Sequence, residues 1–460
     1  MTSSGIWLRF FLAASVLFAA LVATLVFSGV LPPYYDREFS PEDFGEPTLD
    51  FRLIEFDDLE GWRRDDLGEA LGAFVRSCAV FEAGDPQAPA NPLENLGPAH
   101  AGVSLGGVNA DWLRPCAEAR AILVSAYGDP AVRREALRSF FEFHFRPIEI
   151  AVRRAPRPDG PARRANPRIE KKGTFTGYFE PVYRASRERT DTQNAPLYPR
   201  PDDLIEVDLG QFRDELKGER IAGRVERGRL RPYADHAGIN AGALSDKVEP
   251  LAWLDPNDLF FLQIQGSGRL VFDDGAALRV GYAAQNGHAY TAIGRVMVRD
   301  GVMPLEDITM QSIRQWLANA TPDRARVMRE ANASYVFFRE LEEVPAELGP
   351  LGAQGAPLTA ERSLAVDRRY HTLGAPVWVN IEPVVEAGAN PIQRLMIAQD
   401  TGGAIRGPVR GDVFWGSGPD AGEIAGAMNA EGEIAVLLPR RLVERLAPSR
   451  SAVTAWRDAQ

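Results

Sequence analysis

Apolar residues follow three patterns along the chain: one long uncharged run, helical spacing near the N-terminus, and short strand-like segments in the remainder. The uncharged run covers residues 10–31, and helical spacing covers residues 64–150 apart from a Pro/Gly/Asn-rich loop at 84–110. Strands are predicted at 174–185, 251–264, 268–272, 277–282, 335–338, 363–366, 376–381, 393–399, 411–415 and 433–438. Two helices, 286–299 and 305–319, interrupt them, and a Pro/Gly linker covers 345–357. Many short strands with glycine-containing turns predict β-barrels, not an open sheet.

The uncharged run is long enough to cross a membrane. At about 1.5 Å per residue, a helix over residues 10–31 spans the roughly 30 Å of hydrocarbon in a bilayer. Arg9 precedes the run and acidic residues follow it, which predicts that everything after Leu31 is exported. The length favours a retained signal anchor over a cleaved signal peptide, whose apolar region covers only about 7–15 residues.

Composition narrows the class of partner. A chain of 460 residues with a net charge of −11 has room for two or three domains and is a poor match for nucleic acid. A sugar polymer, bound through hydrogen bonds and ring stacking, remains compatible with this charge. The five histidines are scattered without metal-ligand spacing, so the sequence predicts neither a metal site nor a cofactor.

The two cysteines, Cys78 and Cys116, each lie on the apolar face of a predicted helix. Two interpretations remain open at this stage. They can be small buried hydrophobic residues, or they can form a disulfide between the helices in an oxidising compartment.

Candidate chemistry is concentrated near the C-terminus. Asp400 and Asp412 lie twelve residues apart, each at the edge of a predicted strand and each close to glycines. Glycine beside a carboxylate allows a sharp turn and the close approach of a bulky ligand. This arrangement suits an acid that acts on a polymer in an open cleft.

Three motifs together carry a resemblance to a known family. They are residues 173–181, which include Thr176 and Tyr178; residues 261–268 with 279–290, which include Gln265 and Ser267; and the aspartate set Asp367, Asp400 and Asp412. In this order they resemble the membrane-bound lytic murein transglycosylase A (MltA) family, and the last segment resembles its 3D domain, named for three aspartates.

The resemblance implies a mainly β fold with an N-terminal helical section. A double-psi β-barrel would carry a second, inserted β-barrel domain, with a glycan groove between them. The expected domains are a signal anchor (1–31), a tether (32–60), the helical part of the main domain (61–175), the inserted domain (176–320), a connector (321–360) and the catalytic 3D domain (361–445).

The resemblance also implies an activity. Family members cleave the β-1,4 bond between N-acetylmuramic acid and N-acetylglucosamine in peptidoglycan and leave 1,6-anhydromuramic ends. The implied partners are glycan strands, the inner membrane through the N-terminal helix, and other cell-wall enzymes. The implied location is the periplasmic face of the inner membrane, or the periplasm if the N-terminal segment is cleaved.

The matched catalytic acid is Asp412, acting as a single acid and base. Asp400 supports it, although the sequence leaves open which of the two aspartates holds the proton. Thr176, Gln265 and Ser267 are expected to hydrogen-bond the sugars and Tyr178 to stack on a sugar face. Asp367 is expected to be structural, stabilising a turn at the mouth of the barrel.

Three other functions account for part of the pattern. A hydrolytic glycosidase would use a second carboxylate, and a non-catalytic peptidoglycan-binding protein could share the same barrel. Residues 400–402 match the Asp-Thr-Gly motif of aspartic proteases, but one copy would require a homodimer and would leave Asp412 without a role.

Overall fold

A computed structural model describes residues 43–125, 127–159, 165–216, 220–341, 344–345, 348–383 and 390–446. The predicted membrane segment, residues 10–31, lies outside them. No helix within the described ranges is long and apolar enough to cross a bilayer. The chain divides into two compact units, the smaller comprising residues up to Thr48 and Val152–Glu170, the larger comprising Leu49–Ala151 and the chain from Lys171 onward.

The smaller unit contains parts of three strands. They are the first half of β1 (Phe44–Leu53), the end of β2 (Phe145–Pro156) and β3 (Arg168–Glu170). β2 and β3 are antiparallel. Residues 44–53, which the sequence interpretation assigned to a tether, therefore form a strand.

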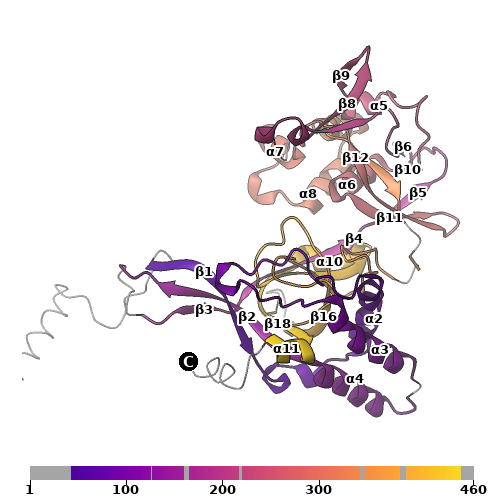
Figure 1. Cartoon of the computed structure of the whole chain (residues 1–460). Helices are drawn as coiled ribbons and strands as arrows, with labels where there is room; N and C mark the ends of the chain where they lie inside the picture. Colours follow the sequence, from indigo (N-terminus) through magenta and orange to yellow (C-terminus); the bar gives the residue numbers. More distant parts are fainter. Residues whose placement is uncertain are drawn as a thin grey trace, which may run out of the picture. The chain divides into compact units, whose positions relative to one another are not determined.

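The larger unit contains a closed barrel, and β4, β16 and β18 of it are labelled in Figure 1. Six of the described strands make a ring in the order β18, β15, β16, β14, β17 and β4, because β4 also pairs with β18. β4 with β17 and β14 with β16 are parallel. The six strands are β4 (Gly173–Glu180), β14 (Ser363–Val366), β15 (Pro376–Ile381), β16 (Ile392–Asp400), β17 (Arg410–Ser417) and β18 (Asn429–Pro439).

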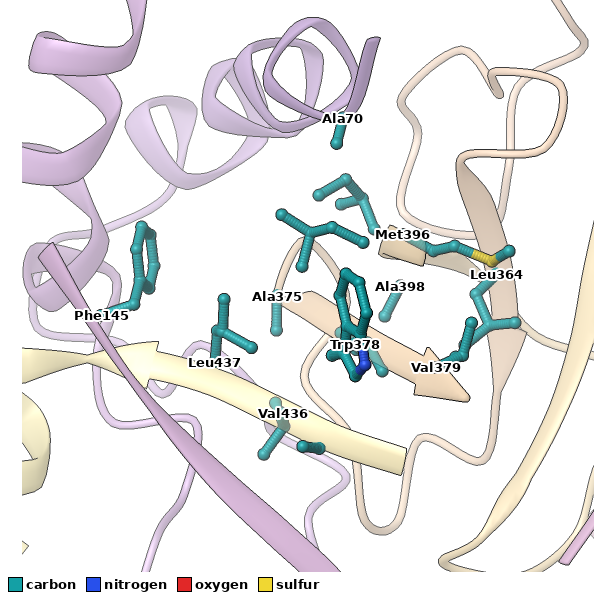
Figure 2. Close-up of a cluster of buried hydrophobic side chains, with 14 of the residues drawn as sticks. Ala70, Phe145, Leu364, Ala375, Trp378, Val379, Met396, Ala398, Val436 and Leu437 are labelled. Carbon is teal, nitrogen blue, oxygen red and sulfur yellow. The ribbon is translucent and has the colours of Figure 1, made fainter. Parts of the chain in front are cut away.

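Three helices precede the barrel: α2 (Gly68–Ala83), α3 (Asn109–Val124) and α4 (Pro130–His144). The predicted helical region ends at His144, earlier than expected, because the chain continues directly into β2. Figure 2 shows Ala70 of α2 above barrel side chains such as Leu364, Trp378 and Met396, all of them buried in one core. Burial of this apolar surface joins the helices to the barrel.

Cys78 and Cys116 form a disulfide that joins α2 to α3. The rings of Phe81 and Trp112 stack beside it with centroids 4.9 Å apart. The sequence left two interpretations of these cysteines open, and the structure confirms the disulfide. The packing of the two helices places the Cα atoms 5.5 Å apart, a separation that a disulfide can bridge.

A second sheet of six described strands has the order β13, β12, β11, β5, β10, β6. A bridge between Pro199 and Phe338 links its two ends. Its strands are β5 (Val182–Ser186), β6 (Ala195–Leu197), β10 (Ala252–Leu254), β11 (Ser267–Phe272), β12 (Ala277–Gln285) and β13 (Val336–Glu340). The expected mainly β architecture with an N-terminal helical section is thus confirmed.

Shorter elements complete the described chain. A small sheet consists of β7 (Ile205–Asp208), β8 (Arg220–Glu226) and β9 (Arg229–Pro232). The remaining helices are α5 (His236–Asn240), α6 (Pro256–Gln265), α7 (Ile293–Arg299), α8 (Met310–Asn319), α9 (Pro322–Glu330), α10 (Pro419–Ala427) and α11 (Arg440–Leu446). Short 3-10 turns are Phe56–Asp58, Trp62–Arg64, Pro98–His100, Leu209–Gln211, Asp214–Leu216 and Leu305–Asp307.

The strand predicted at 251–264 is wrong. Only Ala252–Leu254 is a strand, and α6 follows it. The side chain of Asp255 accepts hydrogen bonds from two backbone N–H groups of the first helical turn, and Pro256 occupies the first helical position. Gly266, with φ 79°, ends the helix. The helix is buried on several sides, so its apolar run shows no helical period.

A buried ion pair links the barrel to the second sheet. Glu180 ends β4, and its carboxylate accepts a 2.7 Å hydrogen bond from Arg279 of β12 and one of 2.6 Å from Ser417 of β17. Arg279 also donates to the backbone carbonyls of Val344 and Leu348. Glu180 therefore has a structural partner at the point where the chain passes from β4 to β5.

Candidate active site

Strand register brings the two aspartates to neighbouring positions on the barrel. Ala365 of β14 pairs with Asp412 on one side and with Asp400 on the other. A register shift in the β14–β16 pairing, after Leu364 opposite Ala398, aligns Asp400 with Ala365 in place of Gln399. Residues in register on adjacent strands share a face, so the two carboxylates lie on the same face.

β4 contributes the hydroxyl groups that contact these carboxylates. Its parallel pairing with β17 places Thr176 opposite Asp412 and Tyr178 opposite Phe414. Thr176 donates a 2.7 Å hydrogen bond to Oδ1 of Asp412, and the Tyr178 hydroxyl donates a 2.9 Å bond to Oδ2 of Asp400. The motif at 173–181 and the aspartate motifs, more than 200 residues apart, thus form one site.

The environment of Asp412 favours its protonated form. Burial is the largest influence and raises its pKa. The hydrogen bond from Thr176 and the positive charge of Arg410 act in the opposite direction, while the charge of Asp400 adds to the increase. The net result is a pKa above the ordinary value for an aspartate. A half-buried carboxyl of this kind can act as a proton donor.

Asp400 is held by three donors. In addition to Tyr178, the backbone N–H groups of Ala353 and Thr401 each donate to its Oδ1 at 2.9 Å. Burial, followed by the charge of Asp400, raises the pKa of Tyr178 well above its ordinary value, so the phenol remains a donor. Tyr178 was expected to stack on a sugar. In the structure its hydroxyl contacts Asp400 and its ring centroid lies 5.3 Å from that of Phe414.

Asp367 lies in a turn just after β14 and is 1% exposed. Burial alone would raise its pKa, but hydrogen bonds from the Arg369 guanidinium and from the backbone N–H groups of Gly407 and Arg369 outweigh it and lower the pKa. The Asp367 carboxylate thus accepts hydrogen bonds both from its own turn, residues 367–371, and from the loop at Gly407. It therefore holds these two segments of the barrel together.

Gln265 and Ser267 lie where helix α6 leads into β11 of the second sheet. Gln265 is the last residue of α6, and its Nε2 lies 3.7 Å from the sulfur of Met310. Ser267 begins β11. Both side chains are exposed, and within the described part of the chain no hydrogen bond joins either of them to Asp400 or Asp412. Thr176 and Tyr178 thus hydrogen-bond the aspartates directly, whereas Gln265 and Ser267 do not among the described residues.

Sequence reasoning overlooked Arg410. It precedes Asp412 by two residues on β17 and therefore shares its face. Its Nη2 donates a 2.9 Å hydrogen bond to Thr176. The period of two along a predicted strand was the signal that could have identified it.

A cavity of about 780 Å³ is lined by residues of the 61–69, 361–362 and 390–394 segments, and neither site aspartate lines it. Two arginines that line it are paired, Arg362 with Asp65 at 2.8 Å and Arg394 with Glu361. Among the described residues, no group of three His, Cys, Asp or Glu side chains is placed to hold a metal ion.

Two family models match the chain: the MltA specific insert domain at residues 174–339 and the 3D domain at 362–438. The membrane-bound lytic murein transglycosylase A of Escherichia coli (strain K12) is 35% identical over 267 residues, which are 57% of this chain and 65% of that relative. The chain thus spans less than two thirds of the length of this relative.

Solved structures extend the comparison. MltA from Neisseria gonorrhoeae, in its monoclinic form, is 33% identical with a TM-score of 0.65, over 85% of this chain and 93% of that one. E. coli MltA with bound chitohexaose is 27% identical with a TM-score of 0.52, over 88% of this chain and 99% of that one. The resemblance noted in the sequence is confirmed, and the chain belongs to the MltA family.

Proposed function

We propose that the protein is a lytic transglycosylase. It cleaves the β-1,4 bond between N-acetylmuramic acid and N-acetylglucosamine in peptidoglycan and forms 1,6-anhydromuramic acid ends, with Asp412 as the single acid and base. The observation that carries the proposal is the half-buried Asp412, whose pKa burial raises, beside an Asp400 already engaged by three donors. The names of the relatives and the chitohexaose bound to one of them support the substrate class.

The reaction needs only one carboxyl group, which serves first as the acid and then as the base. Protonated Asp412 gives its proton to the glycosidic oxygen as the bond to the anomeric carbon breaks. The 6-hydroxyl of the same muramic acid residue attacks that carbon, and the Asp412 carboxylate takes the hydroxyl proton. No water is consumed and the acid is regenerated. Holding the 6-hydroxyl in place replaces the recruitment of water, which favours the intramolecular route.

Asp400 has a different role from Asp412. Its two oxygens accept hydrogen bonds from Tyr178, Ala353 and Thr401. A carboxylate held in this way cannot turn readily to activate a water molecule, but its negative charge stabilises a sugar transition state that resembles an oxocarbenium ion. This is the observation that favours a transglycosylase over a hydrolase with two working carboxylates.

Substrate contacts complete the proposal. Gln265 and Ser267 are exposed hydrogen-bonding groups suited to sugar hydroxyls and N-acetyl groups. The second sheet would serve as the inserted substrate domain and the barrel as the catalytic 3D domain. The N-terminal segment would hold the enzyme at the periplasmic face of the inner membrane, with glycan strands as partners.

Product analysis tests this function. The exported body and its Asp412→Asn variant are incubated with purified peptidoglycan, and the released fragments are weighed by mass spectrometry. We expect the wild type to release fragments one water lighter than hydrolysis products and the variant to release none. Asp420→Asn, an exposed change in α10, is the matched control and should behave as wild type.

The other outcomes are equally decisive. Fragments that carry a full added water would identify a hydrolase with Asp400 as the second carboxylate. Binding of peptidoglycan without any release would identify a non-catalytic binding protein.

A further inference from the structure

The guanidinium of Arg410 is fixed by the two strands that carry the site. Its Nη1 donates to the backbone carbonyl of Thr174, at 3.1 Å, and to that of Gly411. Its Nη2 donates to the Thr176 hydroxyl at 2.9 Å. The side chain therefore spans the β4–β17 pairing and presents one N–H group to the hydroxyl that contacts Asp412.

The direction of this hydrogen-bond chain follows from the chemistry of its members. A guanidinium can only donate, so the Thr176 oxygen must act as the acceptor toward Arg410. The hydroxyl has a single hydrogen. Within the described residues its other partner is Oδ1 of Asp412 at 2.7 Å, so this hydrogen is donated to Oδ1.

The consequence concerns the two oxygens of Asp412. Oδ1 is occupied as an acceptor, so the acid proton is placed on Oδ2. Among the described residues, Oδ2 has no hydrogen-bond partner from the protein. It is therefore the oxygen available to a glycosidic oxygen of the substrate.

We propose that Arg410 is a positioning residue for the proposed reaction. By donating to Thr176 it sets the direction of the Thr176–Asp412 hydrogen bond and so holds the acid proton on Oδ2, toward the substrate. The catalytic meaning of this inference rests on the proposed function, whereas the hydrogen-bond direction does not. The competing explanation is that Arg410 only joins two strands through the Thr174 and Gly411 carbonyls.

A double-mutant cycle separates the two explanations. The variants are Arg410→Met, Thr176→Val and the double variant, with Arg406→Met as a control that removes an exposed arginine nearby. Two quantities are measured for each: the Asp412 pKa, from NMR titration of ¹³C-labelled aspartate carboxyls, and kcat and KM on peptidoglycan across pH. Thermal unfolding checks that every variant is folded.

If Arg410 acts through Thr176, each single variant lowers kcat by about fivefold, the effect of one hydrogen bond of average strength, and leaves KM near the wild-type value. The double variant falls no further than the worse single variant. Asp412 titrates at higher pH in both single variants, since a hydrogen bond and a positive charge that lower its pKa are lost. The alkaline limb of kcat moves to higher pH with it.

Three results overturn the inference. Additive losses in the double variant would show that Arg410 does not act through Thr176. A lower unfolding temperature of Arg410→Met with an unchanged pH profile of kcat would show that Arg410 only joins the two strands. An unchanged Asp412 titration in Arg410→Met would contradict the hydrogen-bond chain. If the wild type releases no anhydro products, the proposed function fails, yet the NMR titrations still decide whether Arg410 acts on Asp412 through Thr176, because they need no substrate.

Discussion

The barrel and the second sheet hold their candidate site residues in different ways. On β4 and β17 of the barrel, Thr176 and Asp412 are in register and hydrogen-bonded to each other. At the second sheet, Gln265 ends helix α6 and Ser267 begins strand β11, and both side chains are exposed to solvent. Groups that move protons need fixed geometry before substrate arrives, whereas groups that bind sugars keep their hydrogen-bonding capacity for the ligand.

The largest expected effect comes from the barrel. Asp412→Asn should lower kcat by about 10³-fold or more, within the range for a lost general acid and base. Its KM should change little, because the amide still fills the space of the carboxyl. Steady-state kinetics on peptidoglycan measure both. A loss confined to KM would mean that Asp412 binds the sugar and another residue supplies the proton.

The link between the two regions should dominate stability. Glu180→Ala leaves Arg279 as an unpaired charge that is 8% exposed and should destabilise the protein by about 3–5 kcal/mol. Removing both partners, as Glu180→Leu with Arg279→Met, should cost less, because no uncompensated charge remains. Denaturant unfolding of both variants checks the order. If the single and the double variant lose the same free energy of unfolding, the loss does not come from an unpaired charge on Arg279.

The disulfide should matter for stability but not for chemistry. Cys78 and Cys116 are separated by 38 positions in the sequence, and their disulfide closes the loop between them. Replacing both with alanine should lower the free energy of unfolding by about 2–4 kcal/mol. The pH profile of kcat should stay unchanged, since neither residue contacts the aspartates in the described structure. A shifted profile would show that α2 and α3 influence the site through the barrel core.

The raised pKa of Asp412 also predicts how stability depends on pH. Its folded-state pKa exceeds its unfolded value, so the folded state binds the proton more tightly. Stability contributed by this group is present at low pH and is lost as pH rises through the folded-state pKa. Asp412→Asn should therefore raise the unfolding temperature relative to wild type at neutral pH and bring no such gain in acid. A gain that is independent of pH would contradict the raised pKa.

The smallest effect is expected in the second sheet. Gln265→Ala should raise KM by roughly fivefold, about one hydrogen bond, and leave kcat within about twofold of the wild type. Glu188→Ala, also in an exposed position of this part of the chain, is a control that should alter neither value. A fall in kcat for Gln265→Ala would show that this residue positions the reacting sugar.

Local pattern predicted the barrel strands well. Residues 363–366 and 376–381 coincide with β14 and β15, because both are short apolar runs bounded by turn residues. The same reasoning failed at 251–264, where an apolar run of similar appearance is a helix. There the Asp-Pro pair at 255–256 was the better guide, since it caps and starts a helix.

The sequence by itself determined the family, the mainly β architecture and the identity of the candidate carboxylates, since these follow from motifs and from periodicity along single segments. Only the tertiary structure decided which groups meet. Asp400 and Asp412 become neighbours through a register shift at Ala365, and Arg410 reaches Thr176 across a parallel pairing between strands more than 200 residues apart. Register between distant strands depends on packing of the whole barrel, so no local pattern reports it.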